Sequence, residues 1–240
     1  MEINKLIMAG CSVSDYTQVD RCFGDNLSEM LGFKYIHRAA GCGSNDRTIR
    51  VITSMVLSGE IKQDDLVLIQ YTNVHRKEFF SKFRRTEETG FFPSDGKATT
   101  LRERYDSGDI IKFKLGASEW QRVEAEKHFF NLYEQNFISE KYDTEVFINR
   151  HYSLLALLEK YNIKTLFILV DGYLTADMED TDIKKFFKSF TNTGKQITYT
   201  NISSFFDRQD NCLEKLPIPP SHFSEKGHYE VANYLYEIVN

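Results

Sequence analysis

Short runs of apolar residues recur along the chain, and longer segments with a helical pattern separate them. The clearest runs cover residues 6–9, 66–69 and 166–170, and two weaker ones cover residues 34–37 and 197–202. A continuously apolar run of this length is typical of a strand that helices cover on both faces of a sheet. The pattern therefore predicts a parallel sheet of roughly five strands.

Apolar residues at helical spacing lie between and after these runs. They occur at residues 27–31, 49–56, 120–133 and 146–161, and again from about residue 225. Ser44 and Ser224 stand where N-caps are expected, and Gly32 and Gly59 stand where helices are expected to end. Because strands that alternate with helices form a parallel sheet covered on both faces, the fold class is predicted to be α/β, a three-layer α/β/α sandwich.

The length of 240 residues suggests a single domain over residues 1–240. Residues 76–118 interrupt the alternation, since they are polar and contain Gly and Pro, and we interpret them as an inserted loop region. The insertion follows the third strand, beside the expected site, so it is suited to form a lid that selects the substrate.

Composition excludes some classes of function. The net charge of −5 argues against nucleic acid as the main partner, because binding phosphates needs a basic surface. No apolar run approaches the ~20 residues that cross a membrane, and no secretion signal is visible. The four cysteines show neither CxxC spacing nor histidines at the spacing of a metal site. We therefore expect a cytoplasmic protein with free thiols and no bound metal.

Four polar clusters follow predicted strands. "AGCSVSD" follows the first strand and "AAGCGSND" the second, while "QYTNVHR" follows the third and "PPSHFSEKGH" comes after the fifth. In parallel sheets the ligand binds beyond the carboxyl ends of the strands. We expect these clusters to converge on that edge of the sheet.

The clusters supply the groups that acyl transfer needs. A serine hydroxyl attacks a carbonyl when a base removes its proton, and we assign Ser12 as nucleophile and His222 as base. The oxyanion that forms needs preorganised donors. The backbone N–H groups of Ser12 and of Gly41 or Gly43 are candidates, together with the side-chain amide of Asn73; the spacing does not separate the two glycines.

Neighbouring residues offer alternatives. Ser14 is a second possible nucleophile. Cys11 is expected to face the packed interior, because neighbours in an extended segment point to opposite sides. His228 falls in the first turn of the last helix and is expected to be a packed, hydrogen-bonded residue. His75 and Arg76 are possible substrate contacts, whereas His37, His128 and His151 are expected at the surface or in packing.

The order of these blocks resembles that of the SGNH (GDSL-like) hydrolases, over nearly the whole chain. The family's first block, usually GDS, is Gly10-Cys11-Ser12 here, and its third block, usually GxND, is represented by "YTNV". The closing "HFSEKGHYEVANYL" is similar to the family's HPSxxGHxxxA ending and is the most specific match. The resemblance implies a flavodoxin-like fold and the activity of esterases, lipases and carbohydrate acetylesterases, with no metal or organic cofactor. Some relatives are O-acyltransferases.

One departure concerns the third member of the catalytic triad. The family usually has Asp two or three residues before the histidine, where Pro219 and Pro220 stand here. A main-chain carbonyl, Asp207 or Asp210 can take its place in orienting His222.

The function expected from the sequence is that of a serine esterase acting on small O-acyl esters, with carbohydrate O-acetyl esters favoured through the resemblance. An O-acyltransferase with a sugar acceptor and a non-catalytic binding module on a decayed hydrolase scaffold are the alternatives. The sequence gives no indication of the oligomeric state or of the natural ester.

Overall fold

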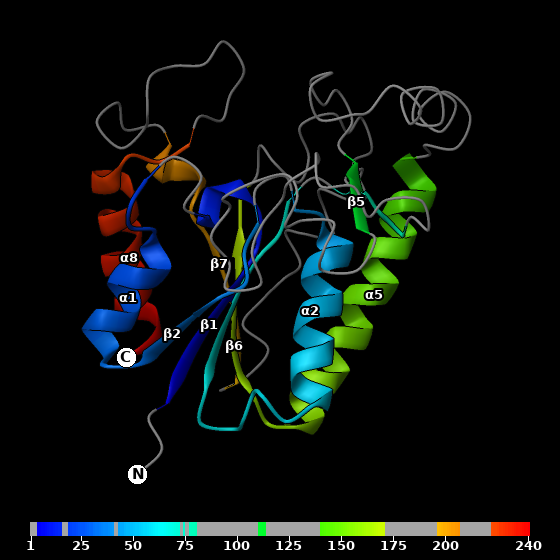
Figure 1. The fold of residues 1–240 in the computed structure, drawn as a ribbon, viewed down its shortest axis with the longest axis horizontal. Helices are drawn as coiled ribbons and strands as arrows, with labels where there is room; N and C mark the ends of the chain where they lie inside the picture. Colours follow the sequence, from blue (N-terminus) through cyan, green and yellow to red (C-terminus); the bar gives the residue numbers. More distant parts are fainter. Residues whose placement is uncertain are drawn as a thin grey trace, which may run out of the picture.

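A five-stranded parallel sheet forms the centre of the molecule (Figure 1). The computed structural model describes residues 4–15, 19–40, 43–72, 74, 77–80, 110–113, 140–170, 196–206 and 222–240. The strand order is β2-β1-β3-β6-β7. The strands are β1 (Lys5–Ala9), β2 (Lys34–His37), β3 (Leu66–Gln70), β6 (Lys164–Leu169) and β7 (Ile197–Asn201). Neighbouring strands pair in parallel throughout this sheet, which confirms the predicted strands and their direction.

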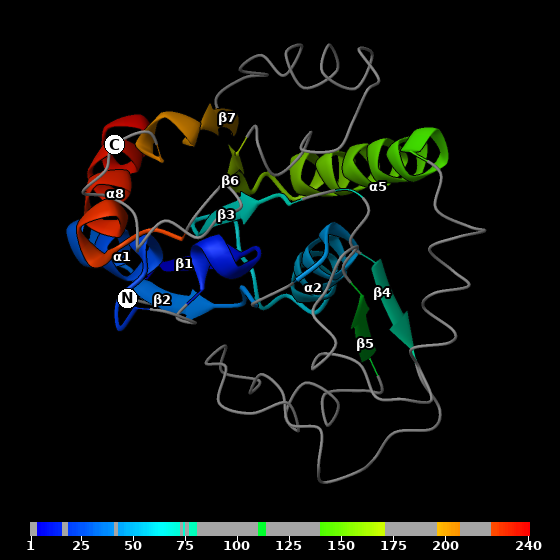
Figure 2. The ribbon, with the colours of Figure 1, turned by 90° about the horizontal axis from the view of Figure 1, so that it is seen from above.

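Helices cover both faces of the sheet (Figures 1 and 2). On one face α1 (Phe23–Leu31) packs against α8 (Glu225–Val239), and on the other α2 (Asn45–Leu57) packs against α5 (Glu140–Lys160). Successive residues of a strand point to opposite faces. Accordingly, Ile7 and Ala9 pack with α2 and α5, whereas Leu6 and Met8 pack with α1 and α8. The three-layer α/β/α sandwich predicted from the sequence is confirmed.

The helix ends follow the expected capping chemistry. The Ser44 hydroxyl accepts a hydrogen bond from the N–H of Arg47, and the Ser224 hydroxyl accepts one from the N–H of Gly227. Gly32 ends α1 in the left-handed region with a φ of 67°, where glycine carries no steric penalty. The Ser44 and Ser224 side chains set where α2 and α8 begin, and both helices start at the carboxyl edge of the sheet (Figure 1).

Two expectations need correction. Residues expected as loop form an antiparallel ribbon of β4 (Lys77–Phe80) and β5 (Ile110–Phe113), in which Phe79 is opposite Ile111. Such bulky residues favour strands, even between polar stretches.

Helix α5 begins at Glu140, before the predicted start. The apolar pattern did not reveal its first turns because they are not apolar. The helix expected at residues 120–133 and most of the insertion lie outside the described residues, so the lid stays a prediction.

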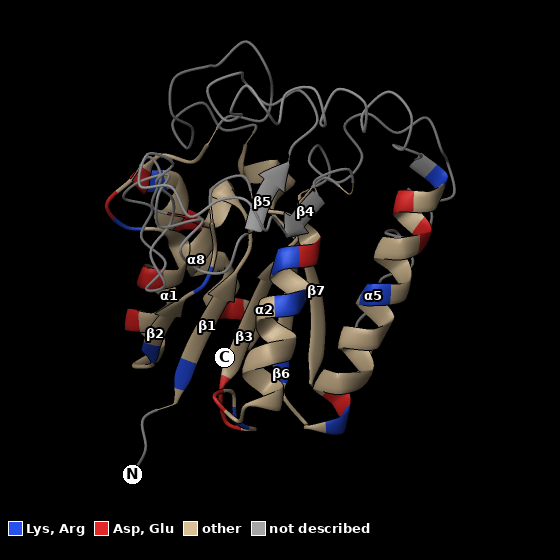
Figure 3. Cartoon of the chain, turned by 45° about the vertical axis from the view of Figure 1, so that its right-hand side comes forward, with Lys and Arg blue, Asp and Glu red and all other residues tan. Residues whose placement is uncertain are grey.

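Charged residues lie on the helices, in turns and at the starts of strands (Figure 3). The buried residues of the five-stranded sheet are mainly apolar, and Gln70, Thr165 and Thr200 are among the polar ones. Among the described residues, no helix has the length and apolar character needed to cross a membrane.

Candidate active site

The predicted nucleophile and base lie on the same edge of the sheet. Ser12 is the first residue of η1 (Ser12–Ser14), the short 3-10 helix that follows β1, and it is half-buried. His222 is also half-buried and lies in residues 222–224, which lead into α8. Figures 1 and 2 both show this segment beside η1. The fold thus brings together two parts of the chain that are separated by most of its length.

Hydrogen bonds within η1 set the direction of the Ser12 backbone. The carbonyl oxygen of Cys11 accepts from both the N–H and the hydroxyl of Ser14, each at 3.1 Å. In a trans peptide the C=O and the N–H point in opposite directions. The Ser12 N–H, which shares its peptide with the Cys11 carbonyl, therefore points away from Ser14 and suits the role of an oxyanion donor.

Gly10 allows this turn to close. A Cβ atom at Gly10 would lie 2.4 Å from the Ser14 hydroxyl oxygen and 2.9 Å from the Gln70 side-chain oxygen. Both separations are shorter than atoms tolerate, so a larger residue would displace the turn. Packing against Ser14 within the turn and against Gln70 at the end of β3 therefore favours glycine in the Gly-Cys-Ser block.

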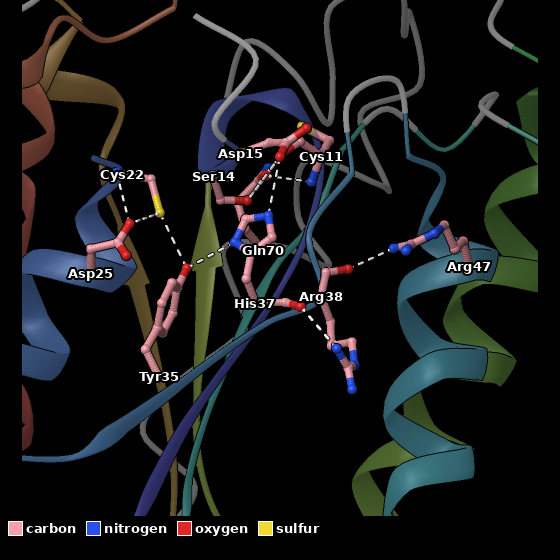
Figure 4. A network of polar contacts seen from close by, with 10 residues as sticks. All are labelled: Cys11, Ser14, Asp15, Cys22, Asp25, Tyr35, His37, Arg38, Arg47 and Gln70. Carbon is pink, nitrogen blue, oxygen red and sulfur yellow. Dashed lines mark hydrogen bonds and ion pairs between the residues drawn. The ribbon is translucent and has the colours of Figure 1, made fainter. Parts of the chain in front are cut away.

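The two rival nucleophiles are held in the interior (Figure 4). The Cys11 thiol is buried and donates to Gln70 Oε1 at 3.1 Å. The Ser14 hydroxyl is fully buried and bonds to Cys11 and Gln70. Both side chains are occupied inside the fold, whereas Ser12 is partly open to solvent, which favours Ser12 as the nucleophile.

A buried polar network extends from the end of η1 toward α1 (Figure 4). Asp15 contacts His37 Nε2 at 3.0 Å, and His37 Nδ1 contacts the Tyr35 hydroxyl at 3.0 Å. Tyr35 in turn contacts the Cys22 thiol at 3.1 Å, at the start of α1. Burial and the nearby Asp25 carboxylate raise the pKa of Cys22 to about 12, so this thiol stays protonated. The network joins η1, β2 and α1 and leaves both ring nitrogens of His37 engaged.

The loop after β2 is held against β1. The Ala40 N–H donates to Gly10 O at 3.1 Å, and the Gly43 N–H donates to Ala40 O at 2.7 Å. A Cβ atom at Gly43 would lie 2.8 Å from Ala40 O. Gly43 therefore makes a tight turn and its N–H already has an acceptor. Gly41, the other candidate donor, lies outside the described residues.

The segment after β3 is held by a residue that the sequence did not single out. Asn45, at the start of α2, accepts from the Thr72 N–H at 2.8 Å through Oδ1 and donates to Thr72 O at 2.8 Å through Nδ2. Thr72 is the residue before Asn73 in the chain. Asn73, His75 and Arg76 themselves lie outside the described residues.

His228 has the packing role expected for it. Its ring is buried, and Nδ1 accepts from the N–H of Phe23 at 3.2 Å, so the neutral ring carries its proton on Nε2. Burial, with a smaller contribution from nearby His222, lowers the pKa of His228 to about 3. Phe223, which stacks on Phe206 with ring centroids 4.0 Å apart, anchors the chain between the two histidines.

Among the described residues, no group of three or more His, Cys, Asp or Glu is arranged to hold a metal ion. The chemistry that this edge offers is that of a hydroxyl, an imidazole and backbone N–H donors.

Comparison with protein-family models gives no match, and comparison with curated proteins gives none either. Among solved structures, the chain is similar to one from Desulfitobacterium hafniense DCB-2 that is described as a lipolytic protein of the G-D-S-L family. The TM-score is 0.53 with 12% sequence identity, over 98% of this chain and 99% of that one. The similarity confirms the fold that the family resemblance implied.

Proposed function

We propose that the chain is a serine esterase that hydrolyses small O-acyl esters. The observation that carries the proposal is the meeting of η1, with half-buried Ser12 at its start, and the segment holding His222 at the carboxyl edge of the sheet (Figure 2). The direction of the Ser12 N–H and the likeness to a G-D-S-L lipolytic fold support it.

In the proposed reaction, the Ser12 hydroxyl oxygen attacks the ester carbonyl while His222 accepts its proton. His222 then returns the proton to the leaving alcohol, and an acyl-serine remains. Water attacks the acyl group while His222 takes a proton from the water, and His222 then returns that proton to Ser12 Oγ as the acid leaves. Each step is balanced by the substrate and water alone.

The oxyanion is stabilised by the N–H of Ser12, the amide of Asn73 and the N–H of Gly41. We favour Gly41 over Gly43 because the Gly43 N–H is bonded to Ala40 O. His75 and Arg76, which follow Asn73, are proposed to contact the substrate.

The usual Asp is absent before His222, and we propose that a main-chain carbonyl orients the ring in a Ser–His dyad. The preferred substrate is a carbohydrate O-acetyl ester, a choice that rests on the family resemblance.

The test is hydrolysis of p-nitrophenyl acetate and butyrate by the wild type and by Ser12→Ala and His222→Ala. A nucleophile and its base act as a unit, so each substitution is expected to remove at least ~99% of turnover. Ser58→Ala is the matched serine control, since Ser58 lies at the far end of α2. Full turnover by Ser12→Ala would overturn the proposal.

Two further measurements separate the alternatives. Faster release of the acyl group from Ser12 to an added sugar than to water identifies an acyltransferase. A folded wild type whose Ser12 does not react with a fluorophosphonate probe identifies a non-catalytic module.

A further inference from the structure

Gln70 is a fully buried polar residue on a strand that is otherwise apolar. It ends β3, whose preceding residues are Leu, Val, Leu and Ile. Burying a carboxamide is costly unless its polar atoms find partners. The partners of Gln70 lie in the nucleophile turn and in the segment after β3, so its place in the core depends on those two segments.

One oxygen of Gln70 faces three polar groups of the turn. Oε1 accepts from the Cys11 N–H at 3.0 Å and from the Cys11 thiol at 3.1 Å, and the Ser14 hydroxyl, whose one hydrogen it shares with the Cys11 carbonyl oxygen, lies 3.3 Å away (Figure 4). Cys11 and Ser14 lie on either side of Ser12 along the chain. A shift of the turn relative to β3 would therefore weaken several hydrogen bonds at once.

The nitrogen of the same amide bonds to the residue that follows Gln70 in the chain. Nε2 donates to the carbonyl oxygen of Tyr71, two residues before Asn73. The planar amide thus ties the turn that holds Ser12 to the segment that leads into Asn73.

We propose that Gln70 is a positioning residue for acyl transfer, which fixes the Ser12 turn relative to the oxyanion segment without contacting the substrate. This inference rests on the proposed esterase function. A displacement of about 1 Å at a reacting group costs on the order of 10²-fold in rate. The loss is expected in kcat and not in KM, because Gln70 bonds to the turn and not to the substrate.

The test compares Gln70→Met, Gln70→Glu and a matched control. Gln70→Met has similar length and no hydrogen bonds, and is expected to lower kcat about 10²-fold with KM within about twofold. Gln70→Glu keeps an acceptor for the turn, and its buried carboxyl is expected to be neutral, with an O–H in place of the N–H that donates to Tyr71 O. Its kcat is expected between those of Gln70→Met and the wild type. Thr165→Val removes another buried hydrogen bond, to Ile163 O at the opposite edge of the sheet, and is expected to keep the wild-type kcat.

Labelling of Ser12 by a fluorophosphonate, measured below the unfolding temperature of each variant, separates positioning from stability. The labelling rate is expected to fall in Gln70→Met and to stay unchanged in Thr165→Val. If Gln70→Met does not fold, Ser14→Ala, which removes the hydroxyl shared by Gln70 Oε1 and the Cys11 carbonyl oxygen, is expected to slow labelling about tenfold. A wild type that is not labelled overturns the esterase function and this inference together. A labelled wild type with equally fast variants overturns the role of Gln70 alone.

Discussion

Asn45 shows how a single side chain can hold a backbone segment of the candidate site. Its amide makes both hydrogen bonds that the buried Thr72 peptide groups need, each at 2.8 Å. A buried backbone group left without a partner costs about 1–3 kcal/mol. Asn45→Leu is therefore expected to lower the free energy of unfolding by about 2–4 kcal/mol, as measured by urea denaturation.

The same substitution is expected to lower kcat, because Thr72 precedes the proposed oxyanion residue Asn73. Asn26→Leu is the control. Asn26 lies on α1, and its side-chain amide also donates to a backbone carbonyl, that of Cys22. Unchanged stability in Asn45→Leu would show that Thr72 does not depend on this amide.

Residues such as Asn45 and Gln70 leave no signal in the sequence. Their hydrogen bonds join positions 27 and 59 apart in the chain, and no spacing rule connects such pairs. Ser12 and His222 were assigned from the sequence because acyl transfer demands a hydroxyl and a base after particular strands. Their assignment as catalytic residues stays a prediction, as does that of Asn73.

At the scale of elements, two buried histidines join helices to the rest of the fold. His151 of α5 contacts the hydroxyls of Tyr71 at 2.8 Å and Tyr199 at 3.1 Å, and burial lowers its pKa to about 4. His228 of α8 accepts a hydrogen bond from α1, and its pKa is about 3. Both rings are therefore neutral in the folded protein at neutral pH.

Acid is expected to destabilise the fold through these histidines. An unfolded histidine has a pKa of about 6.5, so between about pH 6.5 and pH 4 the unfolded chain binds more protons than the folded one. The stability that the neutral rings contribute is complete above that range. It is lost as the pH falls, with a slope of up to about 1.4 kcal/mol per pH unit for each histidine.

His151→Gln is expected to decline less steeply in stability over the same pH range. Glutamine can still hydrogen-bond to the tyrosines but does not titrate. Urea denaturation at a series of pH values measures the slope, and Thr165→Val, which removes no titratable group, is the control for lowered stability. Parallel curves for His151→Gln and the wild type would contradict the assigned role of His151.

Elements were predictable where burial dictates the pattern. The central strands are apolar on both faces, and each gives an unbroken run such as residues 66–69. The caps at Ser44 and Ser224 were predictable because local chemistry defines them. The ribbon of β4 and β5 was missed, since its strands pair across a long polar insertion and local pattern does not reveal such pairing.

At the scale of the whole molecule, the strand order determines which segments meet. Strand β1 lies between β2 and β3, so the turn after β1 borders the loops after both neighbours. Packing of α8 against α1 brings the segment before α8 to the same edge. The order of strands is a property of the whole fold, and the sequence predicted only the edge at which the polar clusters would gather.

A site shared by distant segments is expected to respond as one unit to a covalent ligand at Ser12. After labelling by diisopropyl fluorophosphate, amide hydrogen exchange is expected to slow at residues 10–15, 70–72 and 222–228, because the ligand contacts or orders all three. Peptides at the amino edge, such as residues 62–66 and 159–164, are expected to exchange as before. Ser12→Ala treated with the same reagent provides the unlabelled control. Slowing confined to residues 10–15 would mean that His222 does not share the site with Ser12, and the base would then have to come from elsewhere in the chain.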